Sequence, residues 1–545
     1  MKRSANRTSY SPRNSRHILC VFPHYGKSFG TFHHAYRLMK GIKAFMPPQG
    51  ILVVAAYMPE RWEVRFVDEN IRKARAEDYE WADAVFVSGM HIQRPRIKEI
   101  NHEAHRHGKL TVLGGPSVSG CVEYYPEFDL VHLGELGDAT DSLIEYLDHH
   151  TDRPAAQVRF ETRERRPLND WPIPAYHLVN MDQYFLASVQ FSSGCPYHCE
   201  FCDIPALYGH NPRLKDPERV VAELDAITSA GAVSAVYFVD DNFVGNRKAT
   251  LELMPHLIEW QKRNSYPVEF ACEATLNIAH TPALLEMMRE AYFCTVFCGI
   301  ESPEMGALNA MAKKQNLSMP IHEAIKALND YGMEVVSGII MGLDTDTPET
   351  ADKILEFIAA SNIPMLTLNL LHALPKTALW ARLEKEGRLV YDDALESNVR
   401  FLMPYDTVVD RWKYCIAHAY TPDPLYRRFE YQRDHTFCNR MRIPSRGRAT
   451  PVKMMKGFSV LARILWRVGV LSDYRQTFWR MARPALRTGN IEYVIHVGLV
   501  AYHLIEFTRE CLDGNEAASF YAQRVQAPSR VQGANCLVQG TEAGP

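Results

Sequence analysis

The sequence contains no apolar run long enough to cross a bilayer, which takes about 20 mostly apolar residues. The longest late candidate, residues 493–505, is bounded by Glu492 and Glu506. We expect it to form a buried or interfacial helix. Residues 1–16 are basic and polar, lack the apolar core of a signal peptide, and are predicted to be a disordered tail. A disulfide framework is therefore not expected for the 12 cysteines, and a reducing cytoplasm is their predicted setting.

A strong charge bias is also missing, because 61 basic residues stand against 64 acidic ones. The basic residues concentrate in 453–487, where they alternate with large apolar side chains. This pattern is typical of amphipathic helices on anionic membranes, although a solvated helix packed on the rest of the protein has the same pattern. RNA binding is an alternative for this basic segment, but the sequence has no recognisable nucleic-acid-binding module beside it, so no nucleic-acid partner is expected.

The length of 545 residues predicts several domains. Residues 17–150 alternate apolar strands with amphipathic helices, clearest at 95–107 and 137–148, and several strands end in glycine. The pattern predicts an α/β domain with a doubly wound parallel sheet, which binds ligands at the carboxyl ends of its strands. The predicted strands are residues 17–23, 63–68, 82–89, 109–115 and 128–135.

A proline-rich linker, 151–185, leads to a second strand–helix alternation over residues 186–384. Its six βα units predict a partial (β/α)6 barrel, because a full barrel takes about 250 residues. From 385 to 515 the chain reads as a helical basic region, and 516–545 as a flexible tail. The barrel strands are predicted at 186–193, 234–241, 267–274, 294–301, 334–342 and 364–371, with helices at 217–231, 281–292 and 348–361.

Three cysteines follow the first barrel strand in the run SSGCPYHCEFCDIP, with C-x3-C-x2-C spacing. Cys195, Cys199 and Cys202 could each take one corner of a cubane [4Fe–4S] cluster. No fourth cysteine lies nearby, so one iron would keep an open position, whereas electron-transfer clusters use four cysteines. Zinc would need a fourth ligand such as His198, which lies beside Cys199 and is poorly placed to complete a tetrahedron. A chance grouping of cysteines is the remaining alternative.

The triplet, with Phe201 before its last cysteine, resembles the signature of the radical S-adenosylmethionine superfamily. The resemblance implies that S-adenosylmethionine chelates the open iron and is split into a 5′-deoxyadenosyl radical. It also implies cofactor contacts at later strand ends, although acidic residues there are often helix caps. With Phe201, the implied contacts are Asp240, Asp241, Glu273, Glu301, Gly338 and Gly342.

The glycines that end the N-terminal strands are similar in order to those of cobalamin-binding domains. A dinucleotide site is not expected, because no G-x-G-x-x-G is present. The D-x-H-x-x-G motif that supplies a histidine to cobalt is also absent, so neither that histidine nor the cofactor's own base is expected below the metal. His24 and His91 are candidates for corrin contacts or ordinary loop histidines. The implied cobalamin contacts are Ser88, Gly89, Gly114, Gly115, Gly134 and Glu135.

The whole arrangement resembles the cobalamin-dependent radical S-adenosylmethionine enzymes, and several runs look especially like the hopanoid C-2 methylases of bacteria. These runs include FMPPQGILVVAAY, YFVDDNF, ACEATLNIA, SGIIMGLDTDTPET and NLLHALPKT. The resemblance implies methylation of an unactivated hopanoid ring carbon, at C-2 of ring A. Alternatives are a porphyrin-ring cyclase, a methylase of another lipid, or a non-catalytic cobalamin-binding sensor.

The resemblance further implies a hopanoid lipid substrate, a reducing electron donor such as a flavodoxin or ferredoxin, and peripheral contact with the inner membrane face. No residue can be assigned to the positioning of the target carbon. Cys294 and Cys298 lie on one face of a predicted strand and are expected to be buried. The histidines 102, 105 and 107 are expected on a solvated helix face rather than at a metal.

Overall fold

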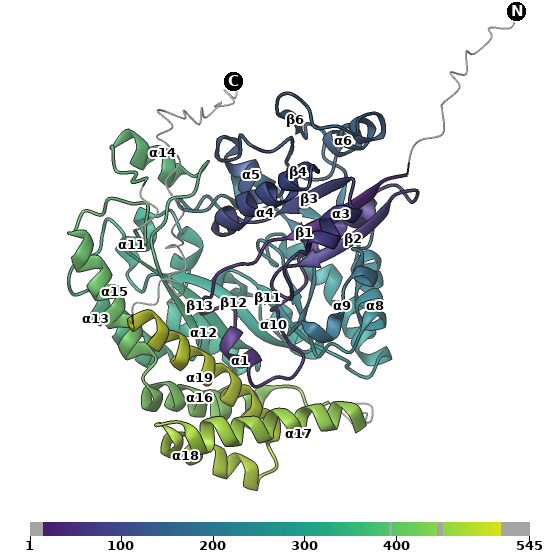
Figure 1. The fold of residues 1–545 in the computed structure, drawn as a ribbon. Coiled ribbons are helices and arrows are strands. Elements are labelled where there is room, and N and C mark those ends of the chain that lie inside the picture. Colours follow the sequence, from purple (N-terminus) through teal and green to yellow (C-terminus); the bar gives the residue numbers. More distant parts are fainter. Residues whose placement is uncertain (1–14, 392–394, 444–450, 514–545) are drawn as a thin grey trace, which may run out of the picture. The chain divides into compact units, whose positions relative to one another are not determined.

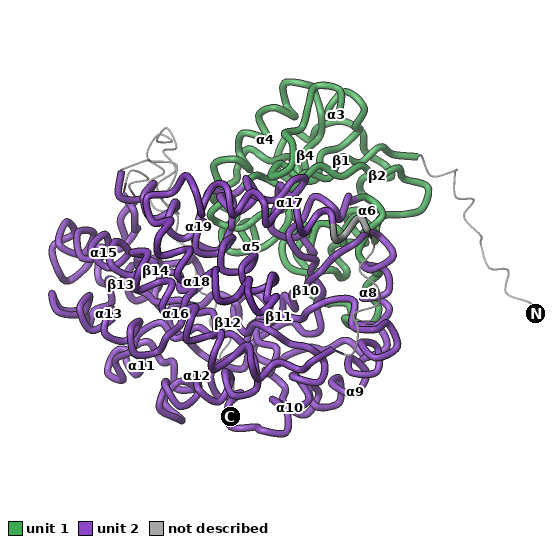
Figure 2. Tube along the Cα trace, turned by 90° about the horizontal axis from the view of Figure 1, so that it is seen from below, with its two compact units in different colours: residues 1–24, 50–178 green, residues 25–49, 179–545 purple. Residues whose placement is uncertain are grey.

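The computed structural model describes residues 15–391, 395–443 and 451–513. The chain divides into two compact units, which Figure 2 draws in green and purple. The first unit comprises residues up to His24 together with Gly50–Leu178, and the second comprises Tyr25–Gln49 and everything from Val179. The predicted tail 516–545 and most of 1–16 lie outside the described residues, although Arg16 is buried and donates to the Leu147 carbonyl at 2.8 and 3.0 Å.

The first unit contains a six-stranded parallel sheet in the order β2-β1-β3-β4-β5-β6. The winding direction reverses between β1 and β3, which is the switch point of a doubly wound sheet. The predicted fold class is therefore confirmed for this unit. Its strands are β1 (His17–Phe22), β2 (Glu63–Asp68), β3 (Ala84–Ser88), β4 (Leu110–Gly114), β5 (Leu130–Leu133) and β6 (Val158–Glu161).

Helices pack on both faces of this sheet, because successive strand residues point to opposite faces. In β3, Val85 and Val87 pack into the same core cluster as Ile97 of α4, whereas Ala84 and Phe86 pack into the opposite cluster. Both faces of the sheet are therefore shielded from solvent, which explains why most of its strands are nearly continuous runs of apolar residues. The helices are α2 (Gln49–Tyr57), α3 (Ala76–Trp81), α4 (Arg94–Arg106), α5 (Pro116–Gly120) and α6 (Asp138–His149).

The second unit contains another six-stranded parallel sheet, with its strands in chain order, β7-β10-β11-β12-β13-β14. Winding in a single direction confirms the partial barrel (Figure 1). Phe238, Phe270 and Phe293 fill its core with ring centroids 5.3–5.5 Å apart. The strands are β7 (Ala187–Val189), β10 (Ala235–Phe238), β11 (Glu269–Glu273), β12 (Phe293–Glu301), β13 (Glu334–Met341) and β14 (Leu366–Leu370).

The helices of the barrel follow its strands, and a short ribbon of β8 (Ser192–Ser193) and β9 (Arg213–Leu214) flanks the loop after β7. Cys294 and Cys298 of β12 are buried, as predicted. The helices are α7 (Ile204–Tyr208), α8 (Pro217–Ala230), α9 (Arg247–Arg263), α10 (Pro282–Glu290), α11 (Met305–Ala310), α12 (Ile321–Asp330), α13 (Thr350–Ser361) and α14 (Ala378–Lys385).

The described part of the C-terminal region is helical from residue 405 on, as predicted. Its helices are α15 (Tyr405–Ala419), α16 (Pro422–His435), α17 (Pro451–Trp466), α18 (Arg475–Arg487) and α19 (Ile491–Leu512), with a π-helical turn at Arg467–Leu471. Helix α19 packs against α16, α17 and α18 and against α1 (His33–Tyr36) (Figure 1). Within the described ranges, no helix has the length and apolar character of a membrane span.

Two local features differ from the sequence-based expectations. Strand β6 falls inside the segment interpreted as a linker, because its four residues, VRFE, alternate apolar with charged side chains and give no apolar run. His105 does not lie on a solvated face: its Nε2 is 3.1 Å from Asp129 Oδ2, and Arg153 bonds the same carboxylate. The histidine is part of a hydrogen-bonded cluster around Asp129, directly before β5.

Candidate functional site

The cysteine triplet lies on the loop that follows β7 and β8. Cys195, Cys199 and Cys202 are free thiols and half-buried. Every other cysteine in the described residues is buried except the exposed Cys438. The triplet is therefore the one group of neighbouring thiols in the described chain that a metal cluster could reach.

The loop turns sharply at its first glycine. Gly194 has φ +98°, and a Cβ there would come within 2.8 Å of the Gly209 carbonyl oxygen. The same carbonyl accepts the Cys195 N–H at 3.1 Å, and the Cys202 N–H donates to the Cys199 carbonyl at 3.1 Å. A glycine is needed here because the first cysteine is brought back against the end of α7.

Two aspartates that follow β10 hold the backbone of this loop. Asp240 accepts hydrogen bonds from the N–H groups of Phe191, at 2.8 Å, and Ser192. Asp241 accepts from the Gly194 N–H at 2.7 Å. Burial raises the pKa of Asp240 to about 7, although both backbone donors lower it. The two carboxylates thus fix the loop that carries the cysteine triplet, the cluster loop, and their implied contact with S-adenosylmethionine stays a prediction.

A buried ion pair lies beside the last two cysteines. Lys313 bonds Glu301 at the end of β12, and its ammonium is 5.6 Å from the ring centroid of Phe201. The Lys313 and Glu301 side chains are only 8% and 11% exposed. Glu301 itself has φ +65°, and a Cβ on Gly299 would come within 2.2 Å of its Oε1. The pair therefore fixes the position of one predicted cofactor contact.

The 3-10 turn after α11 contributes two further polar groups. Gln315 donates to Cys199 Sγ at 3.2 Å. Asn316 donates to the carbonyls of Gly299 and Ile300 at 2.9 and 3.3 Å. Sequence reasoning missed this turn, because the run KKQN has the composition of an exposed loop and carries no motif.

The remaining predicted contacts lie at the next strand ends. Tyr237 donates to Glu273 at 3.2 Å, and burial raises the pKa of Glu273 to about 7. Gly342 has φ +90°, and its N–H donates to Asp346 Oδ2 at 2.7 Å. At Gly338 an added Cβ would lie 3.2 Å from Thr367 Oγ1, which is a tight contact, so neighbouring side chains of the protein already approach the backbone there.

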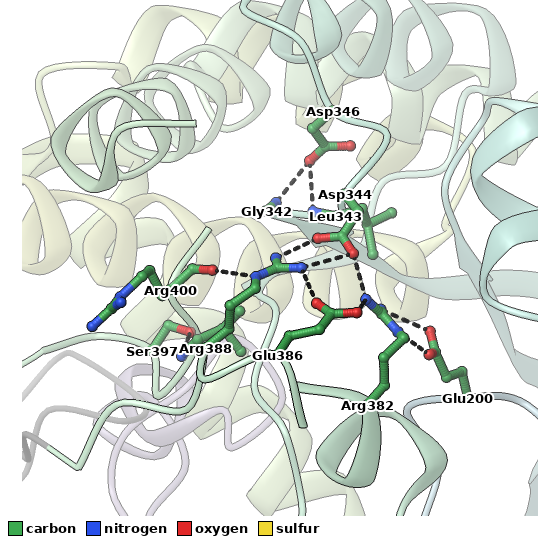
Figure 3. Close-up of polar contacts among 11 residues, drawn as sticks. Glu200, Gly342, Leu343, Asp344, Asp346, Arg382, Glu386, Arg388, Ser397 and Arg400 are labelled. Atoms are coloured by element: carbon green, nitrogen blue, oxygen red, sulfur yellow. Dashed lines mark hydrogen bonds and ion pairs between the residues drawn. The ribbon is translucent and has the colours of Figure 1, made fainter. Parts of the chain in front are cut away.

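A network of ion pairs ties the cluster loop to the chain after β13 (Figure 3). Arg382 of α14 bonds Glu200, between the second and third cysteines, at 2.5 Å, and Asp344 at 2.7 Å. Arg388 bonds the other oxygen of Asp344 at 2.5 Å and, with Arg382, holds the pKa of that carboxyl below its usual range. The network fixes the loop from its outer side.

The chemistry of the donor set fits an iron–sulfur cluster and a polar cofactor. Burial raises the pKa of Cys202 to about 12 and also raises that of Cys195, so bound iron must displace their protons. The Ser192 hydroxyl and one oxygen of Asp240 are buried polar atoms with no hydrogen-bond partner among the described residues. Such groups are costly unless a ligand satisfies them.

In the first unit, the predicted glycines lie together at the carboxyl ends of β3, β4 and β5. Gly115 has φ +92°, and a Cβ there would come within 2.5 Å of Ser88 Oγ and 3.3 Å of the Gly89 nitrogen. Gly134 has φ +99°, and its N–H donates to Ser119 Oγ at 2.9 Å. Bare backbone therefore lines this edge, which suits a large ligand that must approach closely.

Other predicted residues of this edge are held by the protein itself. Glu135 pairs with Arg165 at 3.4 Å. Gly114, by contrast, is open, because an added Cβ there would have no atom closer than 3.9 Å. His91 Nδ1 lies 3.2 Å from Ser117 Oγ, and burial lowers the pKa of His91 to about 4. Burial also lowers the pKa of His24. The contact of either imidazole with a corrin stays a prediction.

Comparisons with known proteins agree with this geometry. The profile of the radical SAM superfamily matches residues 189–358, and that of a domain of unknown function, DUF4070, matches 377–517. A hopanoid C-2 methylase of Rhodopseudomonas palustris is 55% identical over 516 residues, which cover 95% of this chain and 98% of that protein. The chain belongs to the hopanoid C-2 methylase family.

This member of the hopanoid C-2 methylase family is also similar to more distant methyltransferases. An uncharacterized methyltransferase of Synechocystis is 32% identical over 500 residues, covering 90% of this chain and 91% of that protein. The radical S-adenosylmethionine methyltransferase TsrM of Kitasatospora setae, solved with cobalamin and a [4Fe–4S] cluster, has a TM-score of 0.58 at 14% identity. That match covers 88% of this chain and 100% of TsrM and shows a shared fold.

Proposed function

We propose that this protein is a cobalamin-dependent radical S-adenosylmethionine methyltransferase that methylates C-2 in ring A of a hopanoid. The observation that carries the proposal is a half-buried cysteine triplet at the first barrel strand end, in a chain 55% identical to a hopanoid C-2 methylase. An sp3 carbon of such a ring has no acidic proton, so acid–base catalysis by side chains cannot activate it.

Cys195, Cys199 and Cys202 would hold the cluster, and no fourth thiol in the described residues competes for the remaining iron. When bound, the cluster and S-adenosylmethionine supply a hydrogen-abstracting radical, and cobalamin supplies the methyl group. The protein's part is positioning. The carboxylates of Asp240 and Asp241 hold the loop, and the buried amide of Asn242 lies beside Cys195.

Cobalamin would lie against the glycine edge of the first unit. The bare backbone at Gly114, where an added Cβ would have no atom closer than 3.9 Å, leaves room for a corrin edge or nucleotide tail, and the Ser88 hydroxyl beside Gly115 offers a polar contact. A reducing protein such as a flavodoxin or ferredoxin would deliver the electron that the cluster needs.

The substrate is a lipid, and α17 supports contact with a membrane surface. Phe458 and Trp466 are 58% and 62% exposed, and Leu471 in the following turn is 59% exposed. Near them, a pocket of about 430 Å3 is lined by three arginines, which suits anionic headgroups. The lining residues are Arg37, Leu38, Ser459, Ala462, Arg463, Trp466 and Arg467.

The test is product analysis with protein reconstituted anaerobically with iron, sulfide, cobalamin and S-adenosylmethionine, supplied with a desmethyl hopanoid and reduced flavodoxin. We expect a 2-methylhopanoid by mass spectrometry, none from Cys199→Ala, and normal yield from Cys438→Ala, which removes an exposed thiol outside the triplet. Absence of the methylated lipid with all cofactors bound would reject the substrate. Unchanged function of Cys199→Ala in cells would favour a cobalamin sensor.

A further inference from the structure

The short helix α1 brings two adjacent histidines to the end of α19, which contacts it (Figure 1). His34 Nε2 is 3.2 Å and His33 Nε2 is 3.8 Å from Glu510 Oε2. One ligand atom from each of the three residues lies within 4.8 Å of the others. The cluster belongs entirely to the second unit and is separate from the cysteine triplet.

Three of the four ring nitrogens of His33 and His34 are buried without a hydrogen-bond partner among the described residues. His34 is 2% exposed and its Nε2 pairs with Glu510, whereas its Nδ1 and both ring nitrogens of His33 have no hydrogen-bond partner among the described residues. An unsatisfied buried polar atom costs about 1–3 kcal/mol. Burial also favours neutral imidazole, the form whose lone pair binds metals.

Two further groups surround the cluster. Lys27 Nζ is 3.1 and 3.2 Å from the two oxygens of Glu510 and supplies a positive charge there. His503 directs Nε2 at the carbonyls of Ser28 and Phe29, both at 3.1 Å, which leaves its buried Nδ1 with a lone pair and no partner. The side chain of Lys27 is 33% exposed, so its ammonium can rotate out into the solvent when a metal ion binds Glu510 in its place.

We propose that His33, His34 and Glu510 bind a divalent transition metal, zinc by the chemistry of the set. Two imidazoles and one carboxylate are an established zinc donor set, with water as the fourth ligand. Donor atoms of a tetrahedral zinc site lie about 3.3 Å apart, close to the two measured separations from Glu510. The ion would fasten the segment Tyr25–Gln49 to the C-terminal helix, so its role is structural.

The experiment uses the anaerobically reconstituted holoenzyme, cleared of loose metal on a chelating resin and titrated with Zn2+ against a competing dye. We expect about one zinc per chain, and a zinc K-edge absorption spectrum with nitrogen and oxygen scatterers only. His34→Ala and Glu510→Gln each weaken the affinity at least about tenfold. The control His149→Ala/His150→Ala, an exposed adjacent pair on the first unit, leaves it unchanged.

Lys27→Met gives a test that does not depend on losing a ligand. Removal of a cation beside Glu510 is expected to tighten zinc binding several-fold, because like charges repel at this separation. Sulfur scatterers in the spectrum would place the zinc on the cysteine triplet and overturn the proposal. Undiminished affinity in Glu510→Gln, or no tightening in Lys27→Met, would also overturn it.

Discussion

At the scale of single residues, the groups that hold the cysteine loop matter as much as the cysteines. Asp240 and Asp241 are occupied by backbone N–H groups of the loop, and Gln315 donates to Cys199. Cluster assembly therefore depends on side chains that would not themselves be ligands.

Lys313→Met leaves the carboxylate of Glu301 buried without its partner. Loss of one member of a buried ion pair costs about 3–5 kcal/mol, so we expect lower stability in urea unfolding and reduced iron content after reconstitution. The matched control is Lys353→Met, which breaks the exposed pair with Glu304 and should change neither quantity noticeably. Equal effects of the two variants would contradict the role assigned to the buried pair.

Gly299→Ala should disturb the same pair by steric means. The added Cβ would lie 2.2 Å from Glu301 Oε1 and 2.7 Å from Lys313 Nζ, so the pair has to separate. We expect a loss of about 1–3 kcal/mol in the free energy of unfolding. Gly306→Ala, on an exposed position of α11 with no atom within 4 Å, is the control and should be neutral or stabilising. A fully stable Gly299→Ala would show that the pair is not fixed.

The sequence predicts a functional residue only where the pattern that marks it is local along the chain. The three cysteines are identified by spacing within a single loop. Lys313 and Gln315 come from more than a hundred residues later along the chain, and nothing local marks them as neighbours of Cys199. For the same reason the sequence does not predict that His33 and Glu510 are neighbours, because they come together only where α1 packs on α19.

At the scale of elements, the cluster loop is held from α14 and from the turn after β13. Arg382 joins Glu200 to Asp344, and Arg388 shares Asp344 (Figure 3). A loop attached at several points loses less order when one contact opens. These pairs are partly exposed, so each contributes modestly by itself.

Arg382→Gln should therefore loosen the loop without unfolding the chain. We expect the cluster, once assembled, to decay about fivefold faster in air, equivalent to a loss of about 1 kcal/mol. Cluster absorbance followed over time measures this. Arg289→Gln, which breaks an arginine–glutamate pair within α10, is the control and should decay at the wild-type rate. Identical decay of Arg382→Gln and wild type would contradict the bracing role.

Elements with strong apolar patterns were predicted well, and short polar ones were not. Strands β1, β3 and β4 are buried and apolar on both faces and stand out, whereas β6 is half exposed and charged. The π-helical turn at Arg467–Leu471 continues the apolar pattern of α17 and gives no separate signal. The secondary structure of such segments is determined by tertiary packing, which the local sequence does not show.

At the scale of the whole molecule, the exposed face of α17 is the feature that a lipid substrate would explain. Phe458→Ser/Trp466→Ser removes two large exposed apolar side chains and should lower binding to vesicles containing phosphatidylglycerol at least about tenfold. Co-sedimentation measures this. Met305→Ser, an equally exposed apolar residue on α11, is the control and should bind as wild type does. Undiminished binding of the double variant would rule out α17 as the membrane contact.

The central claim is that three thiolates hold a [4Fe–4S] cluster whose fourth iron binds S-adenosylmethionine. The most direct measurement is electron–nuclear double resonance on the reduced, reconstituted protein with S-adenosylmethionine labelled with 17O in its carboxylate and 15N in its amino group. The account predicts hyperfine coupling of both labels to the cluster, and its loss in Cys199→Ala. A cluster that shows no coupling to either label, or a protein that assembles no cubane at all, would contradict it.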